Sequence, residues 1–264
     1  MKITHVSTAY FSPTYSTKAI TELVSGEIRE AGGLQEGENV DLSVQDLGDR
    51  TWSFGPEDLL CIGVPSFGGR VPGAAADRIG RLRGDETPAV ILTAYGNRDY
   101  EDTLLEMKDL LIECGFVVVA GIAAVAQHSI VSECAAGRPD DRDRESLKGF
   151  AHEIWEKLDN LAVLENGEAE VKGNHPYKEF GGSALKPSAD KSCTGCMTCV
   201  GECPVGAIPE DDPAATDKDV CICCMRCVRI CPVHARDLNA IGRMALEQKL
   251  KKLCKDPKEN ELFI

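Results

Sequence analysis

The sequence predicts a five-stranded, doubly wound α/β domain followed by a small α+β domain built around clustered cysteines. In the first part of the chain, short apolar runs alternate with helical patterns, as in a parallel sheet covered by helices on both faces. In the second part, nine of the 13 cysteines crowd between Cys193 and Cys231. We therefore expect a first domain at residues 1–162, a linker at 163–186, a cysteine-rich domain at 187–239, and a basic C-terminal helix with its tail at 240–264.

The five predicted strands are short apolar runs bounded by glycine, proline and polar residues. They lie at residues 3–8, 40–44, 59–64, 89–93 and 116–125, and runs of this kind are buried parallel strands when helices separate them. Asp41 and Ser43 alternate with the apolar residues of the second run, which suits an edge strand. Helical spacing of apolar residues follows the first, fourth and fifth runs, around residues 20–28, 104–111 and 147–161.

Composition excludes several classes of function. The 264 residues include 29 Lys and Arg against 43 Asp and Glu, so the net charge is −14 and the sequence pI is about 4.8. Nucleic acid and anionic membranes both need a basic surface, so we expect neither as a partner. No apolar run approaches the roughly 20 residues of a membrane-spanning helix, and the start does not read as a signal peptide. We expect a cytoplasmic protein without membrane insertion, in which cysteines serve as metal ligands rather than disulfides. The oligomeric state cannot be read from this sequence.

Three loops at the carboxyl ends of the predicted strands carry the features of a ligand site. Ligands of open parallel sheets bind at this edge. The loop after the first strand is rich in hydroxyls and enters a helix, whose free N–H groups suit a phosphate. The loops after the third and fourth strands each combine an aromatic residue with glycine, at Phe67-Gly68-Gly69 and Tyr95-Gly96. Glycine allows close approach of a flat ligand, so the three loops predict a site for a phosphorylated planar ring.

The first of these loops, Ser12-Pro13-Thr14-Tyr15-Ser16-Thr17, resembles the hydroxyl-x-Thr-Gly-x-Thr phosphate loop of flavodoxins. Tyr15 stands where glycine is usual, and we expect it to avoid positive φ. The resemblance implies FMN, with its phosphate held by Ser12, Thr14, Tyr15, Ser16 and Thr17. It further implies that the isoalloxazine is bracketed by Ser66, Phe67, Gly68 and Gly69 and by Tyr95, Gly96 and Asn97. The alternative is that residues 12–17 only cap a helix. His128, just past the fifth strand, is expected to be structural.

The cysteines form a repeated motif. The pattern C-x2-C-x2-C-x3-C-P begins at Cys193 and again, 28 residues later, at Cys221. In such runs three cysteines ligate one [4Fe–4S] cluster and the fourth, before proline, ligates the other. The expected ligands are Cys193, Cys196, Cys199 and Cys231 for cluster I, and Cys221, Cys224, Cys227 and Cys203 for cluster II. A pair of zinc sites is the alternative, but zinc gives no reason for a fourth cysteine and proline in both runs.

The two repeats differ at positions next to their ligands. Cys223 matches no ligand position and is expected to be a spectator thiol. Gly195 and Gly206 of the first repeat correspond to Cys223 and His234 of the second, so we expect the loops of the two repeats to differ in detail.

The cysteine-rich half resembles a bacterial-type ferredoxin with two [4Fe–4S] clusters, and the whole chain resembles the flavodoxin–ferredoxin fusion family of anaerobic bacteria and archaea ("ferrodoxin"). The resemblance implies an electron-transfer flavoprotein or a reductase component. Our first hypothesis is an intracellular electron-transfer protein that passes electrons from a low-potential donor through two clusters to FMN and on to a partner oxidoreductase. The first alternative is a reductase whose FMN reduces a small molecule, and the second is a redox sensor without turnover. No catalytic side chain is legible.

Two arrangements follow from this interpretation. One cluster should face the flavin domain, and we choose cluster II, because Cys221 follows the acidic loop at residues 210–212. The alternative is that this loop is only an exposed turn.

In the tail, Leu246, Leu250 and Leu253 recur at helical spacing among lysines. We expect this basic helix to face the acidic first domain, with residues 262–264 as an apolar anchor. A frayed terminus is the alternative.

Overall fold

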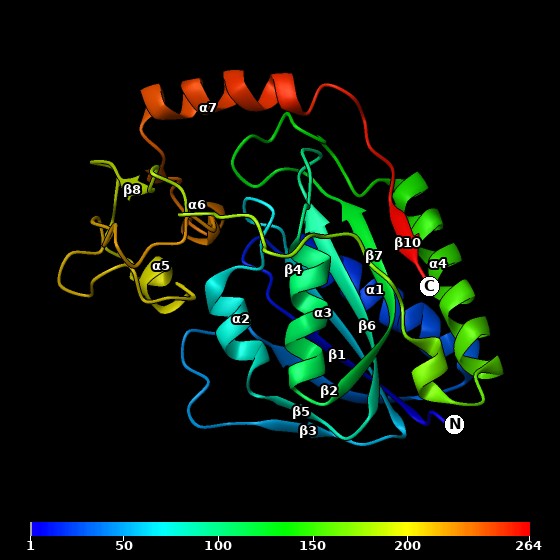
Figure 1. Ribbon diagram of the computed structural model, residues 1–264. Coiled ribbons are helices and arrows are strands. Elements are labelled where there is room, and N and C mark those ends of the chain that lie inside the picture. Colours follow the sequence, from blue (N-terminus) through cyan, green and yellow to red (C-terminus); the bar gives the residue numbers. More distant parts are fainter. Residues whose placement is uncertain (1) are drawn as a thin grey trace.

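A six-stranded sheet forms the centre of the computed structural model, which describes residues 2–264; Met1, the first residue of the predicted first domain, lies outside the described residues. The strand order is β10-β7-β6-β4-β1-β2 (Figure 1). The first five in sequence are parallel to their neighbours, and β10 runs antiparallel to β7. Their bounds are β1 His5–Tyr10, β2 Gln35–Asp41, β4 Asp58–Pro65, β6 Thr87–Tyr95, β7 Phe116–Val125 and β10 Glu261–Phe263.

The five parallel strands include all those predicted, but the second lies earlier in the chain. We placed it at residues 40–44, whereas β2 spans Gln35–Asp41 and pairs with β1 at the edge of the sheet. Its sequence, QEGENVD, is polar and mostly exposed. An edge strand with one neighbour needs little apolar surface, so the hydrophobic pattern identified only its end.

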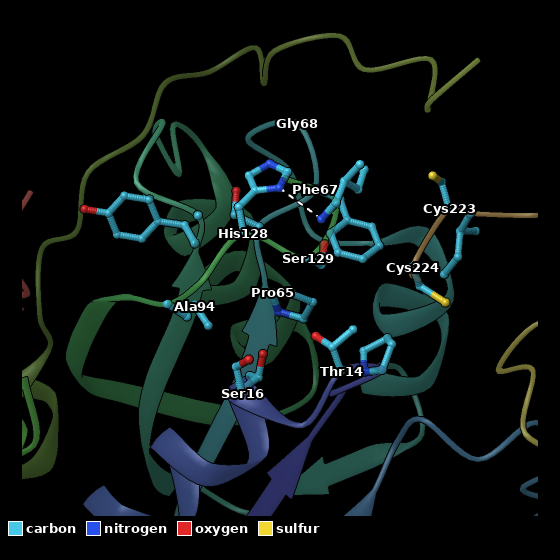
Figure 2. Close-up of a pocket in the computed structure, with 18 of the residues that line it drawn as sticks. Thr14, Ser16, Pro65, Phe67, Gly68, Ala94, His128, Ser129, Cys223 and Cys224 are labelled. Carbon is cyan, nitrogen blue, oxygen red and sulfur yellow. Dashed lines mark hydrogen bonds between the residues drawn. The ribbon is translucent and has the colours of Figure 1, made fainter. Parts of the chain in front are cut away.

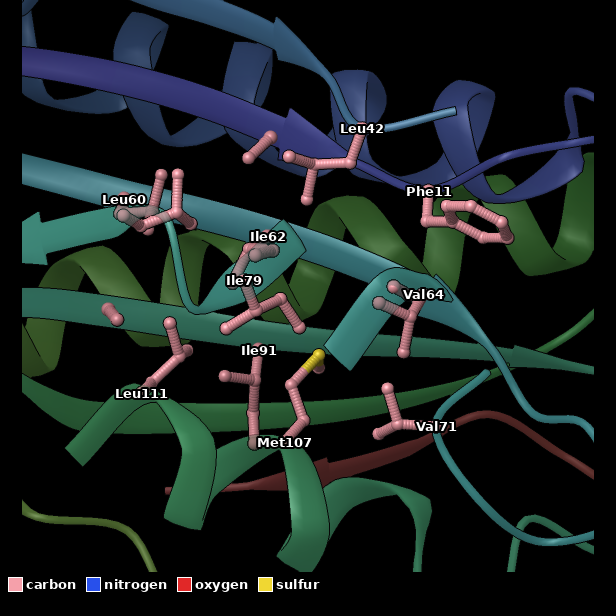
Figure 3. Packing of buried hydrophobic residues seen from close by; sticks show 14 of the residues in the cluster. Phe11, Leu42, Leu60, Ile62, Val64, Val71, Ile79, Ile91, Met107 and Leu111 are labelled. Atoms are coloured by element: carbon pink, nitrogen blue, oxygen red, sulfur yellow. The ribbon is translucent and has the colours of Figure 1, made fainter. Parts of the chain in front are cut away.

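Helices cover both faces of the sheet. Helices α1 (Ser16–Gly32) and α4 (Asp141–Asn160) pack on one face through residues such as Val24 and Ile154. Helices α2 (Gly73–Ile79) and α3 (Thr103–Glu113) cover the other face, where Ile79, Met107 and Leu111 meet Ile62 and Ile91 of the sheet (Figure 3). A small parallel pair, β3 (Trp52–Phe54) with β5 (Leu82–Gly84), extends this second layer. None of the helices in residues 2–264 is long and apolar enough to cross a bilayer.

The cysteine-rich lobe contains two short helices and one two-stranded sheet. Helices α5 (Thr198–Gly201) and α6 (Arg226–Arg229) occupy corresponding places in the two repeats, and β8 (Ser188–Ala189) pairs with β9 (Arg236–Asp237).

The two repeats share a left-handed backbone at three equivalent positions, so the expected difference between their loops is absent at these positions. Gly195 and Cys223 have φ values of 67° and 55°, and Gly206 and His234 have 65° and 53°. Met197 and Met225 are also left-handed, at 62° and 65°. The second repeat therefore adopts the left-handed turns without glycine, at a cost of roughly 1–2 kcal/mol each.

The chain crosses between the lobes along the α3 side of the first domain. A single 3-10 turn, η1 (Leu164–Gly167), follows α4. Asp102, before α3, then accepts hydrogen bonds from the backbone of Asn174 (2.9 Å) and Lys178 (2.6 Å). This segment is ordered but irregular, because side chains of the first domain satisfy its backbone in place of a sheet or helix.

The C-terminal segment connects the cysteine-rich lobe back to the sheet. Helix α7 (Ala240–Leu253) spans the two lobes, and β10 then pairs with β7 (Figure 1). Leu262 and Phe263 pack against the apolar clusters on opposite faces of the sheet. These two residues thus meet the first domain as expected, but as a sixth strand rather than as a loose anchor; Ile264 remains half exposed.

Candidate functional site

A pocket lies at the carboxyl ends of β1, β4, β6 and β7 (Figure 2). The empty space within it, part of which is open to solvent, is about 780 Å³. Thr14 and Ser16 lie at one end, Phe67, Gly68 and His128 at the other, and Cys223 and Cys224 along the side. The pocket thus has walls from both domains.

The end of the pocket at the start of α1 is suited to an anion. Of the residues expected to hold a phosphate, Thr14, Ser16 and Thr17 line it, whereas Ser12 and Tyr15 do not. Ser12 is buried, and its Oγ accepts a hydrogen bond from the Lys18 amide at 2.9 Å, so this hydroxyl braces the loop. Among the described residues, the amides of Ser16 and Thr17 find no hydrogen-bond partner. These amides and the helix dipole therefore favour an anionic group here.

Tyr15 takes the positive φ that we expected it to avoid. Its φ is 72°, and no side-chain hydrogen bond caps α1 at this residue. The ring instead lies beneath the guanidinium of Arg226, 5.3 Å from its centroid. Arg226 follows Cys224 and pairs with Glu202 at 3.0 Å. A cation–π contact to the other lobe thus accompanies a strained backbone that glycine would relieve.

The strain at Tyr15 can be measured with two variants that both lose the ring. Tyr15→Gly should be more stable than Tyr15→Ala by about 1 kcal/mol, because alanine retains the cost of a left-handed backbone. Chemical denaturation of the two variants side by side measures this difference. An alanine variant as stable as the glycine variant would contradict the left-handed conformation.

The opposite end of the pocket is built from aromatic residues and glycines. Five of the residues expected to border a flat ligand line this end: Ser66, Phe67, Gly68, Tyr95 and Gly96. Space there is tight: a Cβ on Gly68 would lie 2.3 Å from the ring of Phe180, and one on Gly96 would lie 2.4 Å from His128. Both glycines are therefore needed for the wall to close around the pocket.

Gly69 and Asn97 were predicted to bracket the ligand, but neither lines the pocket. Gly69 packs against Glu101. Asn97 is buried and holds the C-terminal tail: its Nδ2 donates to the carbonyls of Cys254 and Asp256 at 3.0 Å, and its Oδ1 accepts from the Lys258 amide at 2.9 Å. Asn97 thus links the wall of the pocket to the segment after α7.

Several lining residues were missed by the sequence analysis. They come from the segment after β7, from the linker and from the second cysteine motif: Gln127, His128, Ser129, Ile130, Phe180, Ser183, Ile222, Cys223 and Cys224. The rule about carboxyl ends applies to the fifth strand as well, so the segment after β7 could have been found. The linker has no sequence motif that indicates a ligand site. The cysteine motif indicated iron–sulfur clusters and gave no reason to expect its residues in this pocket.

His128 is held as a neutral imidazole. Its Nδ1 accepts hydrogen bonds from the amides of Ile130 (3.1 Å) and Val131 (3.2 Å), so the remaining proton belongs on Nε2. Burial, with a smaller effect of the Arg98 charge, lowers the pKa of His128 to about 4. Its expected structural role is consistent with these contacts, and it also contributes to the wall.

This pKa predicts a loss of stability in mild acid. The folded value of about 4 lies below the ordinary value of 6.5, so the unfolded chain binds the proton first as the pH falls. The stabilisation is complete above pH 6.5 and declines below it, by about 1.4 kcal/mol between pH 7.5 and 5.5 for this one group. Denaturation of the parent and of His128→Asn at pH 7.5 and at pH 5.5 checks this. The asparagine side chain can accept hydrogen bonds from the same two amides, but it does not titrate. Equal pH dependence in the two proteins would contradict the assignment.

The eight cysteines expected to be cluster ligands line two separate cavities of the second lobe. One cavity is lined by the set Cys193, Cys196, Cys199 and Cys231, and its empty space is about 310 Å³ including the part open to solvent. The other is lined by Cys203, Cys221, Cys224 and Cys227, and its empty space, counted in the same way, is about 330 Å³. In the described part of the chain, no three His, Cys, Asp or Glu side chains converge on a single metal-ion position. Each cavity therefore collects the four cysteines of one expected set, including the fourth from the other repeat.

Backbone amides and burial shape the environment of these sulfurs. The amides of Ala207 and Ala235 donate to Cys203 and Cys231 at 3.3 and 3.2 Å, at equivalent positions of the repeats. Burial raises the pKa of Cys224 to about 12 and that of Cys227 to about 11. The second cavity is thus the more enclosed, and thiolates form there only with a compensating positive charge.

The strand order and the second lobe define the class of protein: a flavodoxin-like α/β domain joined to an iron–sulfur domain of the 4Fe–4S type. Residues 190–208 match the family model of the 4Fe-4S binding domain. A comparison with curated proteins found no match.

Among solved structures, the chain is similar to an archaeal flavodoxin, with 14% identity over 59% of this chain and 99% of that one and a TM-score of 0.37. It is also similar to flavodoxin 2 from Bacillus cereus (16% identity, 58% and 99%, TM-score 0.41). A third similar structure is an NADH:FMN oxidoreductase (14% identity, 66% and 96%, TM-score 0.42). These similarities concern the fold of the first domain, which its own strand order defines.

Proposed function

We propose that the chain is an electron-transfer flavo-iron–sulfur protein of the flavodoxin–ferredoxin fusion type. It passes electrons from a low-potential donor protein through two [4Fe–4S] clusters to FMN and on to a partner oxidoreductase. One observation carries this proposal: Cys224, an expected ligand of cluster II, lines the same pocket as the flavin-binding loops. The sites for the two kinds of cofactor therefore share a wall.

The first pocket fits FMN by its own chemistry. Thr14, Ser16 and Thr17, with the free amides at the start of α1, would hold the phosphate. Phe67, Gly68, Tyr95 and Gly96 would border the ring, where glycine leaves room for a flat ligand. When bound, FMN supplies an acceptor of one or two electrons. The chain's own residues would position it, and Phe180 of the linker lies against Gly68 at that end.

In this proposal the two clusters follow one another from the surface to the flavin pocket. Cluster I would lie at the surface, where Cys196 is exposed and Met197 and Val233 are 38% and 43% exposed. Cluster II would lie inward, against the flavin pocket, because Cys224 lines both sites. Electrons would then enter at the exposed side of cluster I and pass through cluster II, which we propose as the inner cluster.

A second candidate function is an FMN-dependent reductase of a small molecule, fed through the chain's own clusters. One observation favours the reductase: Phe180 and Ser183 of the linker, together with Cys223, close one side of the pocket. A covered flavin admits a small molecule more readily than a large protein. Multiple-turnover reduction of a quinone, nitro compound or enone by the reduced protein would support this candidate, and transfer only to proteins would support the carrier.

Cofactor content tests the proposal directly. Protein purified without oxygen should contain about eight iron and eight acid-labile sulfide per chain, as two [4Fe–4S] clusters require, together with one FMN that acid releases. Iron and sulfide assays and chromatography of the released flavin measure this. Stoichiometric zinc with little iron would refute the assignment of iron–sulfur clusters. An iron-replete protein that lacks flavin, or that releases FAD, would refute the assignment of FMN.

A further inference from the structure

Arg236 is a buried arginine beside the cavity of the Cys193 set. It begins β9, is 2% exposed, and lines that cavity. Its Nη1 lies 3.6 Å from the Sγ of Cys199, an expected ligand of cluster I. A buried cation thus contacts a ligand of cluster I.

The protein around Arg236 does not neutralise its charge. Its remaining hydrogen bonds go to neutral groups: the carbonyls of Pro213 (2.5 Å) and Ala215 (2.9 Å) and the hydroxyl of Thr216. Its buried Nε–H has no partner, and no carboxylate pairs with it among the described residues. A buried, unpaired cation is costly unless an anion lies nearby. A thiolate-bound cluster in the adjoining cavity would supply that negative charge.

The repeat itself shows that packing does not require an arginine here. The residue equivalent to Arg236 in the first repeat, 28 positions earlier, is Ile208. Ile208 is also buried, at 4% exposed. An aliphatic side chain therefore fills the corresponding place, and the charge is particular to the second repeat.

We propose that Arg236 is a positioning residue whose guanidinium donates to a ligand sulfur of cluster I and raises the reduction potential of that cluster. The proposal rests on the two-cluster function proposed above. An electron added to a cluster adds negative charge, which a nearby buried cation stabilises, and hydrogen bonds to the sulfurs act in the same direction. The arginine would thereby make cluster I easier to reduce by an external donor.

Three variants test this in the full-length protein, purified without oxygen. Arg236→Met removes the charge, Arg236→Lys keeps it as a single point, and Arg229→Met removes an exposed charge from the same lobe as the control. Iron, sulfide and FMN are counted first, so that absence of two clusters from the parent would be recognised as failure of the proposed function. Potentiometric titrations followed by electron paramagnetic resonance then give the midpoint potential of each cluster and of the flavin.

We expect Arg236→Met to lower the potential of cluster I by about a tenfold change in the equilibrium for reduction, or about 59 mV for one electron. The flavin potential and the Arg229→Met clusters should stay at the parental values. Arg236→Lys keeps the charge but loses the planar guanidinium, so it should lower the potential of cluster I by less than Arg236→Met does. An unchanged potential of cluster I in a cluster-replete Arg236→Met protein would overturn the proposal. Should that variant fail to assemble, a parental potential of cluster I in Arg236→Lys, or loss of clusters from both variants, would overturn it equally.

Discussion

Replacing Cys196 and Cys199 together with serine is expected to slow reduction of FMN by a low-potential donor by about 100-fold or more. Loss of outer-shell partners alone costs a metal site roughly 10- to 100-fold, and this variant loses two ligands of cluster I. Both residues lie in the outer cavity, away from the flavin pocket. The fold of the first domain and the FMN content should therefore stay at the parental level.

Rapid mixing of the variant with a reduced donor, followed at the flavin absorbance, measures this rate. Cys114→Ser is a suitable control, because Cys114 follows α3 and lines none of the described cofactor cavities. If FMN is reduced at the parental rate without cluster I, then donors reach the flavin by another route and the electron path through the clusters is wrong.

Removal of residues 254–264 is expected to cost about 3 kcal/mol or more in the free energy of unfolding, since Asn97 alone loses three hydrogen bonds of about 1 kcal/mol each. The deletion also removes β10, which leaves the buried strand β7 at the edge of the sheet. Long apolar edge strands promote association. We therefore expect the shortened protein to form dimers or larger species and to bind FMN more weakly, because Asn97 adjoins Gly96 of the pocket wall.

Denaturation, size-exclusion chromatography and FMN titration measure these three effects. Asn97→Ala in the full chain separates them, because it removes the hydrogen bonds and keeps β10; it should weaken FMN binding without association. Deletion of Ile264 alone is the control, since this residue is exposed and lies outside β10. A monomeric deletion variant with parental stability would show that the tail contributes nothing to the sheet.

The parts of the structure that were predictable have strong local signals. Buried parallel strands such as β6 and β7 are continuous apolar runs, so composition alone locates them. The repeated cysteine motif has spacing that few other sites share, and the structure gathers each expected set in one cavity. By contrast, β2 is polar because an edge strand needs little burial, and its position was only partly found.

The parts that could not be predicted depend on contacts between distant segments. Tyr15 keeps a left-handed backbone while its ring meets Arg226, more than 200 positions later in the chain. Phe180 and Cys223 line the flavin pocket because the linker and the second lobe fold over it, which no short sequence window records. Asn97 was expected to border the flavin because of its place in the loop after β6. Its side chain instead holds the C-terminal tail, and no feature of the sequence indicates that the tail passes there.

Because the chain returns to the sheet at β10, the iron–sulfur lobe is attached to the first domain at both of its ends. The iron–sulfur lobe is a loop insertion between two neighbouring strands of one sheet, with both of its ends covalently fixed to the same scaffold. A module tethered at one end swings through a wide cone, whereas one tethered at two ends can only rock about the axis through its attachments. The spacing between its redox centres is then a property of the fold rather than of diffusion. Transfer within one molecule should accordingly be insensitive to solvent viscosity and to protein concentration.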